Sequence, residues 1–352
     1  MSDLTFMKIA LRLSLKGLGY TEPNPLVGAV VVKGGRILSC GHHRGFGAPH
    51  AEAMALERLG VSGTTLYLTL EPCSHTGKTP PCADLIIARR VRRVVVAMID
   101  PNPLVNGSGI ARLRAAGIAT AVGLCRDQAE RINRHYLKYI RTHAPYVAIH
   151  AGLSLDGKLS DDAGRSHWVT SEELRRLAHS LRGEFSAIMA GSGTVRADDP
   201  LLTLREAGWV GKKLYRVVLD SQNALPRSLR IIRELDDFPL VIFSSRHAAD
   251  RSPRTRHHYF VDSDGNGLDL GEVLANLGRL GIASVLVEGG GRLIDSFVRQ
   301  RRFDEVVLFY APKIVGGSGA TRLAEALELR DFRLSELASG FILRGFRPCS
   351  PD

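Results

Sequence analysis

Four residues in the first quarter of the chain have side chains suited to metal chemistry. His50 and Glu52 lie two positions apart in PHAEAMAL, and Cys73 and Cys82 follow in TLEPCSHTGKTPPC. Imidazole and thiolate are common zinc ligands, and a catalytic zinc usually has three protein ligands and one position left for water. His50, Cys73 and Cys82 supply three such ligands. Their spacing therefore predicts a catalytic zinc site with one ion per chain.

Prolines next to these residues indicate where the local elements begin. Pro49 precedes His50, and Pro81 precedes Cys82, so both ligands are expected at helix starts. The free N–H groups and the dipole of a helix start favour a thiolate. Residues at i and i+2 do not share a helix face, so Glu52 is poorly placed to bind the same ion as His50. A carboxylate beside an activated water is suited instead to carrying protons.

The combination of H-x-E with a later P-C-x-x-C is typical of zinc deaminases, which replace a ring amino group by oxygen. This chain differs, because eight residues rather than two separate Cys73 from Cys82. Two alternatives stay open at this point. One is a closed zinc site in which His42, His43 or His75 is a fourth ligand, and the other is a chain that binds no metal.

The composition predicts an ordinary globular protein. A length of 352 residues, with 44% hydrophobic and 24% charged residues, favours two domains. A net charge of +11 favours anionic partners, although paired arginines on solvated faces would give the same charge. Five scattered cysteines argue against a disulfide framework. We expect no membrane partner and a cytoplasmic location, because no apolar run is long enough for a span and the N-terminus lacks signal-peptide features.

The order of expected elements predicts two α/β domains in series. The segment LVGAVVVKGGRILSCGHH reads as a hairpin with a Gly-Gly turn, and strands then alternate with helices. One charged helix in AERINRHYLKYIRTHAP is expected to end at Pro145, which sets the domains at 1–145 and 146–352. Alternating strands and helices return in the second half. The final segment, ASGFILRGFRPCSPD, shows no motif that we can interpret.

Several longer motifs resemble one enzyme family over nearly the whole chain. EPNPLVGAVVV, PHAEAMAL, TLEPCSHTGKTPPCADLII and DPNPLV are similar to the deaminase half of the bifunctional riboflavin-biosynthesis family RibD. HAGLSLDGKLS, SGTVRADDPLLTLR and VEGGGRLIDSF resemble its reductase half. The resemblance implies a cytidine-deaminase-like three-layer domain, followed by an α/β domain similar to dihydrofolate reductase.

The same resemblance implies two successive reactions on a phosphorylated pyrimidine. Zinc-dependent deamination of 2,5-diamino-6-(5-phosphoribosylamino)pyrimidin-4-one comes first. Reduction of the ribosyl group by NADPH then gives 5-amino-6-(5-phosphoribitylamino)uracil. We also expect a homo-oligomer that binds no nucleic acid.

The resemblance also implies which residues of this sequence bind the metal, the substrates and the cofactor. It implies His50, Cys73 and Cys82 as zinc ligands and Glu52 as the catalytic proton carrier. The implied pyrimidine-binding residues of the first half are Asn24, His42, Lys78 and Asn102. The implied substrate-binding residues of the second half are Ser166, Arg182, Leu202, Arg205 and Glu288. The implied NADPH-binding residues are Gly152, Trp168, Thr194, Asp198, Ser221, Gly290, Gly291, Arg292, Leu293, Ile294, Asp295 and Ser296.

Physical chemistry supports these reductase roles unequally. EGGGRL lies between an expected strand and helix, so its backbone N–H groups can approach a pyrophosphate, although a tight turn explains the glycines equally well. Arg182 and Arg205 could each hold a phosphate with two hydrogen bonds, while a solvated arginine is commoner. Trp168 is equally suited to the core and to the wall of a cofactor pocket.

Two rival functions remain. A nucleic-acid base deaminase with a non-reductase second domain would share the HAE and PC elements and the basic charge. That reading leaves the motifs of the second half unexplained. The other rival is a zinc-containing interaction protein without catalytic activity.

Overall fold

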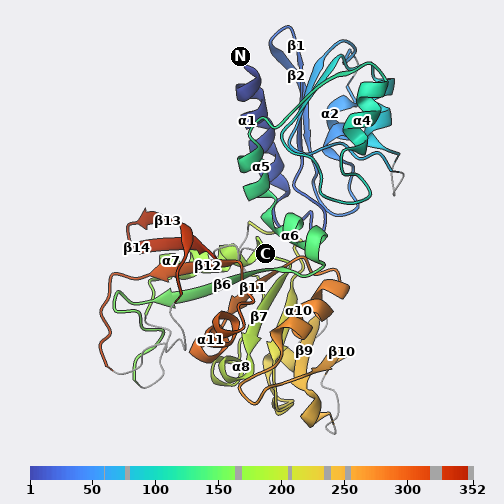
Figure 1. Cartoon of the computed structure of the whole chain (residues 1–352). Coiled ribbons are helices and arrows are strands. Elements are labelled where there is room, and N and C mark those ends of the chain that lie inside the picture. Colours follow the sequence, from blue (N-terminus) through green and yellow to red (C-terminus); the bar gives the residue numbers. More distant parts are fainter. Residues whose placement is uncertain are drawn as a thin grey trace. The chain divides into compact units, whose positions relative to one another are not determined.

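The chain forms two compact units, Met1–His143 and Ala144–Asp352 (Figure 1). A computed structural model describes residues 1–58, 60–75, 80–162, 169–204, 208–233, 239–249, 255–317 and 327–347. Each unit has its own sheet and its own hydrophobic core. The two units are therefore described one at a time.

The first unit contains a five-stranded sheet of order β2-β1-β3-β4-β5. β1 is antiparallel to β2 and β3, while β3, β4 and β5 are parallel to one another. The strands are β1 (Gly28–Lys33), β2 (Arg36–His42), β3 (Thr65–Leu68), β4 (Arg93–Val96) and β5 (Ala119–Val122). The helices are α1 (Asp3–Ser14), η1 (Leu15–Gly17), α2 (Ala51–Leu56), α3 (Cys82–Ala88), α4 (Ser108–Ala115), α5 (Arg126–Ile132) and α6 (Arg134–Thr142).

The predicted hairpin is confirmed. β1 and β2 pair antiparallel, and Gly34 and Gly35 join them with φ angles of 56° and 75°. A two-residue turn that follows the twist of the strands needs positive φ at both positions, which glycine adopts without strain.

Alternating side chains of the strands build a core on each face of this sheet. Val30 and Val32 of β1 pack with α1, α5 and α6 through residues such as Phe6 and Leu137. Val31, one residue along, points the other way and packs with α2, α3 and α4. Figure 1 shows α1 and α5 on one side of the strands and α2 and α4 on the other. The unit is therefore a three-layer α/β/α domain.

The charged helix expected near the end of the first unit is two helices, so that prediction was wrong. α5 ends at Ile132 and α6 begins at Arg134, with Asn133 between them at φ −95° and ψ 16°. The Asn133 carboxamide is buried, accepts from the Leu26 N–H at 2.7 Å and donates to the Leu26 carbonyl at 3.1 Å. This tertiary contact interrupts a helical pattern that the charged residues suggested was continuous.

The second unit contains a nine-stranded sheet of order β10-β9-β8-β7-β11-β6-β12-β14-β13. The strands from β10 to β12 in this order are parallel, and β14 and β13 add antiparallel at one edge. The strands are β6 (Tyr146–Leu153), β7 (Ala187–Gly191), β8 (Tyr215–Leu219), β9 (Leu240–Ser245), β10 (His257–Val261), β11 (Ser284–Glu288), β12 (Glu305–Tyr310), β13 (Arg330–Leu337) and β14 (Gly340–Phe346).

Helices cover both faces of this sheet. Leu274 of α10 (Leu270–Arg279) and Phe297 of α11 (Gly291–Arg299) pack on one face with Val147 and Val285. Leu181 of α7 (Glu172–Arg182) packs on the other face with Ala148. The helices are α7 (Glu172–Arg182), α8 (Ser192–Asp198), α9 (Arg230–Arg233), η2 (Arg246–Ala248), α10 (Leu270–Arg279) and α11 (Gly291–Arg299). The parallel arrangement brings the carboxyl ends of β6, β7, β8 and β11 to one edge.

The C-terminal segment without a readable motif contains β14, which pairs with both β12 and β13. β13 is the edge strand, and all its residues except the last are exposed. An exposed edge strand lacks the alternation of apolar and polar residues from which strands are usually predicted.

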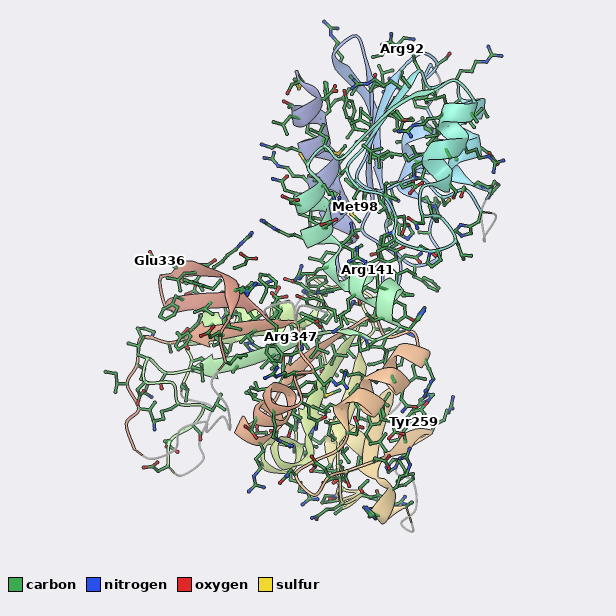
Figure 2. All side chains as sticks on the ribbon, viewed as in Figure 1. Arg92, Met98, Arg141, Tyr259, Glu336 and Arg347 are labelled. Carbon is green, nitrogen blue, oxygen red and sulfur yellow. The ribbon has the colours of Figure 1, made fainter. Side chains whose placement is uncertain are left out.

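Arginine side chains on the outside of each unit account for part of the basic charge. Arg90 and Arg92 are exposed in the first unit, and Arg301 and Arg302 in the second. Figure 2 shows Arg92 pointing away from the sheet, whereas Met98 lies within its unit. Among the described residues, no helix is both long and apolar enough to cross a membrane.

Candidate functional site

The structure brings His50, Cys73 and Cys82 together at the carboxyl edge of the first sheet. Nδ1 of His50 lies 3.3 Å from Sγ of Cys82 and 3.7 Å from Sγ of Cys73. All three donor atoms lie within 4.8 Å of one another. In a tetrahedral zinc site with bonds of about 2.0–2.3 Å, donor atoms lie roughly 3.3–3.8 Å apart. The donor set and its spacing therefore fit zinc.

Two helix starts position these ligands. His50 is the residue that precedes α2, and Cys82 is the first residue of α3. The Cys82 N–H donates to Sγ of Cys73 at 3.3 Å, which stabilises a thiolate there. α2 approaches β2 closely at Gly41, where a Cβ atom would lie 2.3 Å from the Ala51 carbonyl oxygen. Glycine at that position therefore allows α2, which His50 precedes, to pack closely on β2.

The two sulfurs interact strongly with each other. Hydrogen bonding from Cys82, supported by His50, lowers the pKa of Cys73 to about 4 despite burial. Hydrogen bonding to Cys73, together with burial, raises the pKa of Cys82. The hydrogen bond to Cys73 also raises the pKa of His50. A divalent cation between the three side chains would stabilise both sulfurs as thiolates.

Glu52 is buried in the first turn of α2, with 3% of its surface exposed. Burial raises its pKa to about 7, and the charge of His50 opposes that shift. A carboxyl group with a pKa near neutrality can both accept and donate a proton at physiological pH. Glu52 also forms a side-chain hydrogen bond with Cys82. Within the described part of the chain, the metal-ligand cluster has three members, and Glu52 is not one of them.

The four residues expected to contact the pyrimidine have different surroundings. The side chain of Asn24 lies 3.3 Å from Nε2 of His43, and Asn102 accepts from the Leu104 N–H in a loop after β4. His42 is half-buried at the end of β2, where burial lowers its pKa. Lys78 lies outside the described residues.

His43 joins Asn24 to the ligand cluster, a contact that the sequence prediction missed. The His43 ring is buried and packs edge-on against His50, with 5.6 Å between centroids. Its Nδ1 lies 3.1 Å from the Pro49 carbonyl oxygen. Sequence reasoning chose His42 for the pocket and kept His43 only as an alternative fourth ligand, because neighbouring histidines cannot be ranked without knowing which one faces inward.

The second unit contains a cavity of about 1150 Å³ at the carboxyl edge of its parallel strands. In open parallel sheets, ligands bind at this edge. The sequence-predicted residues that line the cavity are Gly152, Thr194, Asp198, Ser221, Gly290, Gly291, Arg292, Leu293, Asp295, Ser296, Arg182, Leu202 and Glu288. Ile294 instead packs in the core, while Ser166, Trp168 and Arg205 lie outside the described residues.

Glycine and a helix start shape one wall of this cavity. A Cβ atom on Gly152 would lie 2.8 Å from Cγ2 of Thr170, so the close approach of these segments needs glycine. Gly290 immediately precedes α11, and its N–H donates to Oγ1 of Thr194 at 3.3 Å. The EGGGRL segment thus joins β11 to α11, as its position between an expected strand and helix predicted.

Arg182 and Glu288 form a paired ion bridge in the cavity wall. Nε and Nη2 of Arg182 donate to the two carboxylate oxygens of Glu288 at 2.9 and 2.6 Å. Burial alone would raise the pKa of Glu288, but the charge of Arg182 holds that pKa below its usual value. Nη1 of Arg182 donates to the Thr203 carbonyl at 2.9 Å. The sequence analysis considered Arg182 as a residue that could bind a phosphate through two hydrogen bonds. In the structure, Glu288 binds the Nε and Nη2 atoms that such a phosphate would use.

Two histidines that sequence reasoning did not select also line this cavity. His150 lies on β6, donates from Nδ1 to the Val307 carbonyl at 3.1 Å and has a pKa lowered by burial. Nδ1 of His179, on α7, lies 3.3 Å from Nη1 of Arg182. A histidine inside the apolar run YVAIHAGL was the available signal for His150, because a polar side chain in a buried strand needs a partner or a role.

Comparisons with known proteins agree with both units. Residues 1–98 match the cytidine and deoxycytidylate deaminase zinc-binding region, and residues 145–341 match the RibD C-terminal domain. The riboflavin biosynthesis protein RibD of Aquifex aeolicus is 40% identical over 349 residues, with 97% of each chain covered. RibD of Escherichia coli is 39% identical over 353 residues, covering 94% of this chain and 95% of the relative.

A solved structure agrees in fold over the same extent. It is the diaminohydroxyphosphoribosylaminopyrimidine deaminase/5-amino-6-(5-phosphoribosylamino)uracil reductase of Thermotoga maritima. It is 36% identical, covers 98% of both chains and has a TM-score of 0.86. The predicted fold class, a cytidine-deaminase-like three-layer domain followed by a dihydrofolate-reductase-like domain, is confirmed.

The fold and the two sites define a bifunctional enzyme in which a zinc-dependent deaminase is joined to a reductase. The chain belongs to the RibD family of riboflavin biosynthesis. Zinc and NADPH, the two expected cofactors, agree with the two matched domains. The nucleic-acid deaminase alternative is not favoured, since it leaves the matched reductase domain unexplained.

Proposed function

We propose that residues 1–145 deaminate 2,5-diamino-6-(5-phosphoribosylamino)pyrimidin-4-one. We propose further that residues 146–352 reduce the ribosyl group of the product to a ribityl chain. The names of the similar Thermotoga protein's two activities support these substrates. The single observation that carries the first half is the cluster of one imidazole and two sulfurs beside a buried carboxyl group.

In the deaminase site, His50, Cys73 and Cys82 would hold zinc. Bound there, zinc lowers the pKa of a water molecule and so supplies a nucleophile at neutral pH. Glu52 would take up a proton from the attacking water and deliver it to the amino nitrogen, so that the C–N bond breaks with release of ammonia while the ring carbon keeps the oxygen of the water. A pKa of about 7 suits both halves of that transfer.

The pyrimidine would lie against the two PNPLV loops through Asn24 and Asn102, with His42 and Lys78 completing the pocket. Asn24 is linked to the zinc site through His43, which packs on His50. The Asn102 loop follows β4, beside the strand that leads to Cys73. These links favour a role for both loops in orienting the ring over the metal.

In the reductase site, NADPH supplies the hydride and the protein supplies orientation. Gly152, Trp168, Thr194, Asp198, Ser221 and residues 290–296 would bind the cofactor. Ser166, Leu202, Arg205 and the Arg182–Glu288 pair would bind the substrate. Because the Glu288 side chain is only 15% exposed and its pKa is lowered beside Arg182, it presents a fixed carboxylate that suits the ribosyl hydroxyl groups.

The test is to supply the diaminopyrimidinone phosphate with and without NADPH and to identify the products by mass. Without NADPH we expect replacement of one NH by O together with ammonia release. With NADPH we expect the further addition of two hydrogen atoms. A wild-type chain that leaves this compound unchanged would refute the proposal.

Location and assembly complete the proposal. A cytoplasmic location suits a site with two free thiols, because reducing compartments preserve thiols. Self-association suits the edge strand β13, on which Phe332 and Leu334 are exposed at 67% and 54%. Light scattering during size-exclusion chromatography would report the mass in solution, and a monomer at micromolar concentration would refute the homo-oligomer.

A further inference from the structure

The first turn of α6 contacts both loops that contain a PNPLV motif. The motifs begin with an acidic residue in each case, Glu22 in EPNPLVG and Asp100 in DPNPLVN. Neighbouring residues of α6, His135 and Tyr136, bind these two acids. The repeated sequence therefore corresponds to a repeated contact with one helix.

The link to the first loop is buried. Nδ1 of His135 donates to Oε1 of Glu22 at 2.7 Å, and the two side chains are only 8% and 11% exposed. Asn133, just before α6, binds the N–H and the carbonyl of Leu26. The segment that carries Asn24 is thus held on both sides of that residue, by His135 of α6 at Glu22 and by Asn133 at Leu26.

The link to the second loop is also buried. The Tyr136 hydroxyl donates to Oδ1 of Asp100 at 2.7 Å, and the same oxygen accepts from the Asn102 N–H at 2.9 Å. Tyr136 and Asp100 are 6% exposed each. Removing the Tyr136 hydroxyl therefore removes a support for the backbone that carries Asn102.

Glu71 holds the other side of the second loop and connects it to the metal site. Its carboxylate accepts from the N–H groups of Asp100, Gly107 and Ile110 at 3.2, 2.9 and 3.1 Å. Glu71 lies two residues before Cys73. The second loop is consequently anchored to the ligand-bearing segment by Glu71 and to α6 by Tyr136.

We propose that the first turn of α6 is a positioning element for the deaminase substrate, in which His135 fixes the Asn24 loop and Tyr136 fixes the Asn102 loop. This inference rests on the proposed function, because it assumes that these loops bind the pyrimidine. Neither residue touches the reacting atoms. Each acts by holding one loop in the orientation that accepts the ring.

Two single substitutions separate the two links. Tyr136→Phe removes the hydroxyl that binds Asp100, and Glu22→Gln removes the charge that binds His135. Each is expected to raise KM for the diaminopyrimidinone about ten-fold, as loss of one hydrogen bond to a charged group predicts. We expect kcat, zinc content and the reductase reaction to change little, since the metal ligands are untouched.

Amide hydrogen exchange supplies a readout that does not depend on activity. Exchange should become faster in peptides covering 100–107 in Tyr136→Phe and in peptides covering 22–27 in Glu22→Gln. Each variant should leave the other loop unchanged. Tyr67→Phe, which removes a hydroxyl that binds Asp3 of α1 rather than either loop, and Glu57→Gln, at an exposed position after α2, are the matched controls.

The outcomes separate this inference from the proposed function. Faster exchange with an unchanged KM would show a purely structural contact and overturn the inference, as would unchanged exchange or loss of zinc. Failure of the wild-type chain to release ammonia from the diaminopyrimidinone would refute the proposed function instead. In that case the exchange data still decide whether α6 orders the two loops.

Discussion

The two sites of this chain are built in opposite ways. The deaminase site has its three candidate metal ligands and the buried carboxyl group of Glu52 within one short segment, positions 50 to 82, which includes the starts of two helices. The reductase cavity takes its lining from His150 to Phe309, across the ends of several parallel strands. Metal and proton chemistry depends on a few atoms at fixed distances, whereas hydride transfer depends on a shaped cavity. One substitution can therefore abolish the deaminase activity without affecting the reductase activity.

The largest expected effect is that of Cys82→Ser. The change removes one of three ligands, so we expect loss of stoichiometric zinc and of ammonia release. NADPH oxidation with the deaminated substrate should persist, because that cavity lies in the other unit. Cys40→Ser, at an exposed cysteine of β2, is the matched control. Full zinc content in Cys82→Ser, measured by metal analysis, would contradict the ligand assignment.

Glu52→Gln should remove proton transfer while leaving the ligands in place. We expect deamination to fall by about 10²–10⁴-fold, the range for loss of a general acid–base group. Zinc content and reductase activity should match those of the wild type. Glu57→Gln, five residues along and exposed, should have no effect. Turnover by Glu52→Gln at the wild-type rate would rule out this role for the carboxyl group.

Glu288→Gln tests the reductase side of the comparison. It leaves the Arg182 side chain, which is only 13% exposed, without its counter-charge, and this is expected to cost about 3–5 kcal/mol of unfolding free energy for the second unit. Reductase activity should fall while ammonia release persists. The matched control is Glu172→Gln, which breaks an ion pair with Arg176 that is 70% exposed on both sides and should cost under about 1 kcal/mol. If denaturant titrations showed that the two variants lose equal unfolding free energy, the importance of burial would be contradicted.

The smallest expected effect is a pH dependence of the difference in unfolding free energy between the wild type and Glu288→Gln. Because Arg182 holds the pKa of Glu288 below its unfolded value of about 4.3, the ionised carboxylate stabilises the native state above that pH. As the pH falls through the native pKa, Glu288 gains a proton and that stabilisation is lost. The gap in unfolding free energy between the wild type and Glu288→Gln should therefore narrow below about pH 4. A gap that stays constant down to pH 3 would contradict the assigned pKa direction.

Ligand chemistry restricts which residue types can bind a metal, so the sequence could single out the members of the first cluster. His50, Cys73 and Cys82 were chosen by residue type, by spacing and by the prolines beside them, and the structure brings all three together. The choice between His42 and His43 was beyond sequence patterns, because it depends on which ring faces inward at the end of β2.

The reductase cavity was less predictable from local patterns. The Arg182–Glu288 pair joins α7 to β11 across more than one hundred positions, so no spacing rule could reveal that the arginine binds a carboxylate. The break between α5 and α6 was missed for the same reason, since Asn133 is held by Leu26 of a distant loop. Short-range periodicity predicted the elements, while these long-range polar contacts set their ends and the orientation of their side chains.

Metal analysis combined with both activity assays tests the central claim most directly. The purified chain should contain one zinc ion, and removal by a chelator should abolish ammonia release while NADPH oxidation with the deaminated substrate continues. Adding zinc back should restore ammonia release. Deamination that survives complete zinc removal, or a purified and active chain without stoichiometric zinc, would contradict this account.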